Sequence, residues 1–161
     1  MSTSSLRPEL QDFSSIICFK SVVVGMEDAL GGMAAAISLK AAGRHRGTAL
    51  ASSLGFGTRD ISLAEAQEAL DAAIGRRGTR VCAVDLIEKV TAPDGSDAHR
   101  VHLRETICSA GEPQGSTREL TFTLGAVHGA LEVLLRRKLR AKQIGSVLRG
   151  QTHDVLEFTN R

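Results

Sequence analysis

The chain has 161 residues, a formal net charge of +2, and five Phe but no Trp or Tyr. This length fits one domain that can bury a core without disulfides or metals. So small a charge and so few rings argue against a nucleic-acid binder, which needs a basic surface and often stacks bases on aromatic side chains. The basic run at 136–140 is expected to end a helix, where cations complement the helix dipole.

The N-terminus and the cysteines predict a cytoplasmic protein. Residues 1–12 contain no apolar core of a signal peptide, and no apolar run approaches the roughly 20 residues of a membrane span. The three cysteines, at positions 18, 82 and 108, are expected to stay reduced in the cytosol. Residues 1–14 are polar and rich in serine, so we expect a flexible arm, followed by a single domain over 15–161.

The N-terminal half of this domain is predicted to be helical. Apolar residues recur at helical spacing through most of 26–42, with Gly43 as the expected stop, and a second short helix is expected over 46–54. Ser62 opens a clearer helix, because Glu65 follows at the spacing of a capping box. The apolar stripe that continues from there gives this helix one buried face.

From residue 79 onwards the pattern becomes strand-like. Residues 80–89 and 99–107 alternate between apolar and polar side chains around a loop with Pro and Gly, which predicts an antiparallel hairpin. Residues 118–137 read as a helix that is apolar nearly all round and therefore deeply buried, and 138–149 with 154–158 predict a second hairpin. The expected fold is a mixed α/β (α+β) domain. Its N-terminal helices pack on a small antiparallel sheet, and one buried, glycine-containing helix lies between two hairpins.

The first hairpin carries an anomaly. If its turn is centred on 93–94, paired residue numbers sum to 187 and one face collects Cys82, Val84, Leu86, Val101, Leu103 and Glu105. Because alternate residues of a strand share a face, this apolar face is predicted to be buried, with Glu105 on it opposite Cys82. A buried carboxylate costs several kcal/mol unless it is paired, protonated or bound to a metal.

The thiols near this carboxylate suggest a metal site. Cys108 follows Glu105 by three residues, so Cys82, Glu105 and Cys108 are a reasonable start on a tetrahedral zinc site. Ser116 is the nearest fourth ligand in sequence, with His128 or a water molecule as alternatives. The competing interpretation is that both cysteines are core residues and that Glu105 pairs with an arginine.

The stretch from Gly75 to Phe158 resembles the 4-vinyl-reductase-type, or hydrocarbon-binding, domain family. The segments that carry the resemblance are 75–79, 105–108, 122–131 and the closing hairpin through Glu157-Phe158. Their order is similar to that of the family, with a strand pair, an acid-plus-cysteine loop, a buried helix and a final strand pair. The resemblance implies a small-molecule-binding domain whose fold is similar to that of Bet-type membrane-tethering subunits.

The same resemblance implies zinc. In the phenol-responsive members of the family, the metal ligands fall on the positions of Cys82, Glu105, Cys108 and Ser116. The serine departs from the family's cysteine at the fourth position, and a hydroxyl is a poor zinc ligand at neutral pH. Zinc is therefore one expectation for the cofactor, beside the interpretation in which these residues belong to the core.

The leading hypothesis is a sensory or carrier module that binds a hydrophobic small molecule, such as a hydrocarbon, an aromatic or a tetrapyrrole-like compound. Its pocket is expected between the helices and the concave face of the sheet. The expected wall residues are Val84, Leu86, Leu103, Phe122, Val127 and Leu131. The alternative for each of them is a place in the solid core.

A second hypothesis is a dimeric scaffold that uses the same fold for protein–protein interaction. A homodimer is expected in either case, because residues 30–42 carry more apolar helix surface than one chain needs. An enzyme is not expected, since the sequence contains no nicotinamide or flavin motif that would supply a hydride to a vinyl group.

Overall fold

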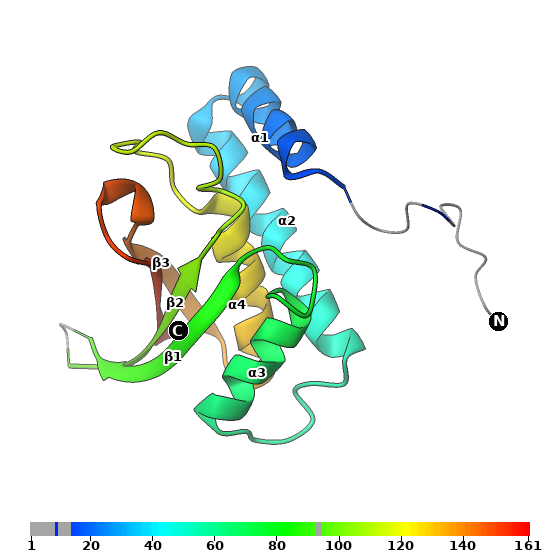
Figure 1. Ribbon diagram of the computed structural model, residues 1–161. Coiled ribbons are helices and arrows are strands. Elements are labelled where there is room, and N and C mark those ends of the chain that lie inside the picture. Colours follow the sequence, from blue (N-terminus) through cyan, green and yellow to red (C-terminus); the bar gives the residue numbers. More distant parts are fainter. Residues whose placement is uncertain (1–8, 10–13, 93–94) are drawn as a thin grey trace.

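The computed structural model describes residues 9, 14–92 and 95–161. The elements in chain order are α1 (Ile16–Leu30), α2 (Gly32–Ser53), α3 (Leu63–Ala73), β1 (Ala83–Thr91), β2 (Asp97–Arg104), α4 (Thr121–Leu135), β3 (Leu139–Gly145), a short 3₁₀ helix η1 (Val147–Arg149) and β4 (Asp154–Asn160). The predicted mixed class is confirmed (Figure 1). Most of the predicted arm, at 1–8 and 10–13, and the predicted turn centre at 93–94 lie outside the described residues.

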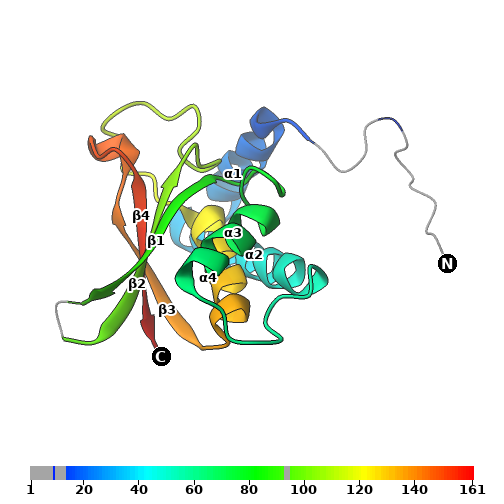
Figure 2. The same cartoon turned by 60° about the horizontal axis from the view of Figure 1, so that its bottom comes forward.

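The strands form an antiparallel sheet in the order β1-β2-β4-β3, and the helices lie on one side of it (Figure 2). α4 packs against the sheet, α2 packs along α4, and α3 contacts β1. The core between these layers is almost entirely aliphatic, with Phe158 as its one fully buried ring within the described residues. In the same part of the chain, no helix is both long and apolar enough to cross a bilayer.

The α2–α4 contact depends on four glycines, which we call the glycine seam: Gly43 and Gly47 on α2, and Gly125 and Gly129 on α4. A Cβ atom at any of them would lie 2.0–2.2 Å from a backbone carbonyl oxygen of the opposite helix. The prediction that Gly43 ends a helix is therefore wrong, and α2 runs through it without a break. A glycine inside a helix costs about 1 kcal/mol relative to alanine, but here its missing side chain lets two backbones touch.

The helix predicted over 26–42 is divided between α1 and α2. Gly31 separates them, and its φ of 78° is one that residues with a Cβ rarely adopt. Large apolar side chains on these two helices remain exposed, namely Ile17, Val22, Leu30, Met33 and Ile37. The excess of apolar surface expected from the sequence is thus present on the described chain.

The first hairpin follows the predicted register only in part. Val84 faces Leu103 as expected, but a β-bulge before Leu86 shifts the pairing, so that Ile87 and not Leu86 faces Val101. Leu86 is 44% exposed, whereas Ile87 is 4% exposed. The predicted place of Leu86 on the buried face is wrong, because one extra residue moves the following side chains to the opposite face.

The capping box that opens α3 is confirmed. Ser62 Oγ accepts a hydrogen bond from the Glu65 backbone N–H at 3.2 Å, and Glu65 Oε2 accepts one from the Ser62 N–H at 2.8 Å. The buried helix α4 is also confirmed, somewhat shorter than predicted at each end.

Candidate functional site

A cavity of about 470 Å³ opens where α2 connects to α3. Its wall consists of loop residues 54–59 and 61, the α3 face that carries Ala69 and Ala72, and the side chain of Arg77. Pockets that hold small ligands usually enclose about 300–1,000 Å³. We call this the α2–α3 cavity.

Part of the cavity wall is apolar. Phe56 and Ile61 are half-buried and pack directly against the core, and Ala69 is itself a core residue. Ala69 and Ala72 present only methyl groups, so space remains between α3 and the loop. The wall suits a hydrophobic molecule, which would extend the core when bound.

The rim of the cavity is charged, but much of the charge is paired. Arg59 Nη2 donates to Glu65 Oε1 at 2.6 Å, and Arg77 lies 3.3 Å from Asp71 Oδ2. The hydrogen bond from Arg59, together with the capping contacts of Ser62, lowers the pKa of the Glu65 carboxyl to about 2. Because Arg59 and Arg77 already pair with carboxylates, we expect a neutral ligand to bind there more tightly than an ion.

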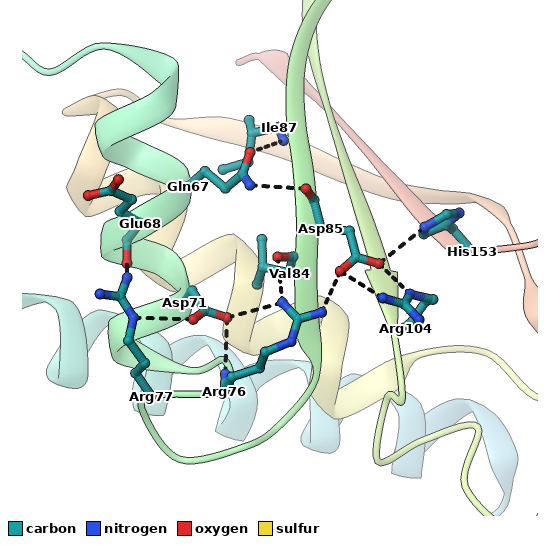
Figure 3. A network of polar contacts seen from close by, with 10 residues as sticks. All are labelled: Gln67, Glu68, Asp71, Arg76, Arg77, Val84, Asp85, Ile87, Arg104 and His153. Carbon is teal, nitrogen blue, oxygen red and sulfur yellow. Dashed lines mark hydrogen bonds and ion pairs between the residues drawn. The ribbon is translucent and has the colours of Figure 1, made fainter.

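The turn at residues 75–79 ties α3 to β1 at one end of the cavity (Figure 3). Arg76 donates to the Val84 carbonyl at 3.1 Å and to Asp85 Oδ1 at 2.5 Å, and its own N–H donates to Asp71 Oδ1 at 3.0 Å. A Cβ at Gly75 would lie 2.2 Å from Asp71 Oδ1. The glycine-arginine pattern is therefore a structural clamp between helix and strand.

The clamp contacts the β-bulge, whose extra residue is Asp85. Gln67 of α3 donates to the Asp85 carbonyl at 3.0 Å and accepts from the Ile87 N–H at 3.2 Å, which satisfies backbone groups that the bulge leaves unpaired. Arg104 and Arg76 donate to the Asp85 carboxylate and hold its pKa well below the usual range (Figure 3). The backbone of the bulge is thus held by Gln67, and its side chain is held by Arg76 and Arg104.

The predicted pocket wall has a different place. Four of its six residues are buried in the solid core, namely Val84, Leu103, Val127 and Leu131. Phe122 is half-buried and packs edge-on against Phe19 of α1, with ring centroids 5.0 Å apart. Leu86 lies on the other face of the sheet, and none of the six lines the α2–α3 cavity.

The predicted metal ligands do not come together. Cys82 and Cys108 are buried, but Glu105 is exposed with a φ of 51°, because β2 ends one residue before it. Ser116 Oγ donates to Glu112 Oε2 at 3.3 Å. Burial raises the pKa of the Cys82 thiol and so disfavours the thiolate that binds metals. Within the described ranges, no group of three or more His, Cys, Asp or Glu is placed to hold a metal ion.

A buried aspartate organises this loop instead. Asp154 is fully buried, and its Oδ2 accepts from Thr106 Oγ1 at 2.8 Å and from Ser109 Oγ at 3.0 Å. Its Oδ1 accepts from the Val147 N–H at 3.0 Å. We call this the Asp154 knot, and it joins the loop after β2 to the β3–β4 connection.

No protein-family model matches the chain, and no curated protein sequence matches it. Among solved structures, the phenol-responsive sensory domain of the transcription activator PoxR, with phenol, is similar at a TM-score of 0.65 and 12% identity. The match covers 91% of this chain and 75% of that one. Subunit 3 of a trafficking protein particle complex from Naegleria fowleri, covalently bound to palmitic acid, is similar at a TM-score of 0.59 and 14% identity, over 91% and 92% of the two chains.

These likenesses show the fold, which the two solved domains share with this chain. They agree with the fold that the resemblance to the 4-vinyl-reductase-type family implied, but at such low identity they do not show membership of that family. The α2–α3 cavity itself was missed from the sequence. Its one available signal was the Gly55-Phe56-Gly57 segment, an aromatic residue between glycines that bounds the second predicted helix.

Proposed function

We propose that this domain binds a small hydrophobic molecule in the α2–α3 cavity, in a sensory or carrier role. The observation that carries the proposal is a cavity of about 470 Å³ in which the apolar part of the wall is continuous with the core. The fold likeness to a phenol-responsive sensory domain and to a palmitate-bound subunit supports the same role.

The chemistry of the wall narrows the ligand. Phe56 and Ile61 offer apolar contact, while the rim carboxylate of Glu65 is already held by Arg59. An aromatic or aliphatic molecule with at most one polar group fits this wall, because a charged ligand would have to break existing ion pairs.

Filling the cavity tests the proposal. Ala72→Phe places a ring in the cavity from a half-buried position on α3, while Ala64→Phe places the same ring on an exposed position of the same helix outside the cavity. We expect native mass spectrometry to find a bound molecule, or phenol or palmitic acid to bind on addition, for wild type and Ala64→Phe. Ala72→Phe should lose at least about tenfold in affinity while still unfolding cooperatively. Equal binding by both variants would refute the site.

The alternative role is a dimeric scaffold. It is favoured by the exposed apolar side chains on α1 and α2, of which Ile17 is 74% and Met33 83% exposed. A second copy is the occupant we propose, since a self-complementary apolar patch suits a twofold dimer. Sedimentation should give a dimer at tens of micromolar for wild type and a monomer for Met33→Glu, and a wild-type monomer would contradict it.

A cytoplasmic location, the lack of enzymatic activity and the lack of nucleic-acid affinity also stay predictions. The last has a simple test, because counterion-driven contacts with DNA or RNA dissolve as salt rises. Binding that persists at a few hundred millimolar salt would contradict it.

A further inference from the structure

A second, smaller cavity of about 230 Å³ lies near the chain reversals that lead into α3 and out of α4. Its apolar lining comes from Ile61, Leu63, Leu134 and Leu135. At about 30 Å³ for each water in the liquid, it has room for roughly eight atoms the size of a water molecule. We call it the His99 cavity, after the histidine that lines it.

His99 brings a titratable ring to the lining of this cavity. It projects from β2 and is only 9% exposed, yet its ring makes no hydrogen bond to any described residue. Its ring nitrogens are not among the buried side-chain atoms that lack a partner in the described chain, so they remain accessible. The ring borders the cavity, where a bound ligand can form a hydrogen bond with it.

The charge around this histidine is positive. Arg137 lines the cavity and forms no ion pair with a described carboxylate. Lys89 of β1 also lines it, and its Nζ forms an ion pair with Asp97 Oδ2 at 2.7 Å. Asp60 also borders the cavity, but its side chain is 96% exposed and lies 3.3 Å from Arg136. The cavity therefore combines an apolar floor with two cationic side chains, of which Lys89 is paired with Asp97 and Arg137 forms no ion pair within the described chain.

From this combination we infer that the His99 cavity binds a small apolar carboxylate, with its body against the leucines and its carboxylate between Arg137 and His99. The leucine floor disfavours inorganic phosphate, which has no apolar surface to bury. The cationic rim disfavours a neutral isostere, because charge-assisted hydrogen bonds are about twice as strong as neutral ones. The site is distinct from the α2–α3 cavity, although Ile61 borders both.

Protonation of His99 should accompany binding. Burial, followed by the charges of Arg137 and Lys89, lowers the pKa of His99, and Asp97 opposes this weakly. A bound carboxylate adds a negative charge beside the ring and raises that pKa again. Affinity should therefore increase as pH falls from about 8 to about 5.5, across the ordinary histidine pKa, while carboxylates remain ionised.

Calorimetric titration of the whole chain with benzoate tests the inference, with benzamide and inorganic phosphate as the matched neutral and non-apolar probes. We expect benzoate to bind at least about tenfold more tightly than either. Arg137→Gln should lower the benzoate affinity about tenfold or more, and Arg140→Gln, an exposed arginine of β3 outside the cavity, should leave it unchanged.

The pH dependence provides a second readout. His99→Gln keeps a polar side chain without a titrating ring, so the rise in affinity at low pH should disappear, and the NMR titration of His99 in wild type should move to higher pH with benzoate. Equal binding of benzamide, equal binding of phosphate, or an unchanged affinity in Arg137→Gln would each overturn the inference. Ala72→Phe separates the two sites, since it should leave benzoate binding intact whether or not the α2–α3 cavity takes a ligand.

Discussion

Helix α2 takes part in two regions that are packed in opposite ways. Along α4, the glycine seam brings backbones so close that a single added methyl group would overlap a carbonyl oxygen. Beyond its C-terminal end, the loop to α3 leaves a cavity of about 470 Å³. The two regions are successive in the chain and share the same aliphatic core.

The difference in packing predicts different effects of substitution in the two regions. Close backbone contact at the seam gives dense packing, which makes that region intolerant of change. The loop region has less of this packing, because the wall of an open cavity lacks dispersion contacts on its open side, and the proposed ligand would supply them. We therefore expect substitutions at the seam to alter stability, and substitutions around the cavity to alter binding.

The largest effect is expected at the seam. Gly47→Val should destabilise the domain by about 4 kcal/mol or more, because its Cβ would meet the Ala126 carbonyl oxygen at 2.0 Å. Urea unfolding followed by circular dichroism measures this. Gly25→Ala is the control, since no atom lies within 4 Å of a Cβ there and alanine favours a helix by up to about 1 kcal/mol. Similar curves for both variants would remove the distinction between the two regions.

The Asp154 knot should come next. Asp154→Ala leaves Thr106, Ser109 and the Val147 N–H without their buried acceptor, which should cost about 3 kcal/mol in unfolding free energy. Asp97→Ala, on an exposed ion pair with Lys89, should cost less than about 1 kcal/mol. A small loss for Asp154→Ala would mean that other contacts hold the loop after β2.

A smaller effect is expected at the residues predicted to hold zinc. Cys108→Ser should cost about 1–2 kcal/mol, as an ordinary buried substitution does, since Cys108 Sγ only accepts a hydrogen bond from Thr123 at 3.3 Å. Elemental analysis should find well under one metal per chain. One zinc per chain, lost in Cys108→Ser together with several kcal/mol of stability, would revive the metal hypothesis. Ser116→Cys should change neither result.

The smallest effect is expected at the capping box beside the cavity. The folded-state pKa of Glu65, about 2, lies below its ordinary value, so this carboxylate stabilises the fold above about pH 4.5 and loses that contribution as pH falls towards 2. Glu65→Gln keeps hydrogen-bonding capacity without titrating. Its melting temperature should therefore depend less on pH between about 4.5 and 2 than that of wild type. Identical profiles would mean that the Arg59–Glu65 pair adds no stability.

Local signals in the sequence predicted the elements better than their contacts. The Ser62–Glu65 capping box and the all-round apolar pattern of α4 identified two helices, because both patterns depend on neighbours a few residues away. The prediction that Gly43 ends a helix was wrong for the same reason. A glycine that stops a helix and a glycine that lets a neighbouring backbone approach look alike in sequence. The register of the first hairpin was right at Val84 and failed two residues later.

The candidate site could be predicted only in kind. The proposal of a hydrophobic ligand came from the aliphatic composition and the resemblance, but the predicted wall consisted of core residues such as Leu103 and Leu131. A cavity is a place where packing is incomplete, and no local pattern distinguishes a residue that borders one from a residue that fills a core. Asp154 was missed because its acceptor role depends on Thr106, which is 48 residues away.

The sequence by itself determined the class of fold, the helix patterns with local signatures and the aliphatic character of the core, since these depend on composition and on spacings of a few residues. Tertiary structure alone decided the course of α2 through Gly43, the bulge at Asp85, the exposure of Glu105 and the position of both cavities. Each of these arises where segments distant in sequence meet, and the free energy of such a contact belongs to the pair of surfaces and not to either segment alone.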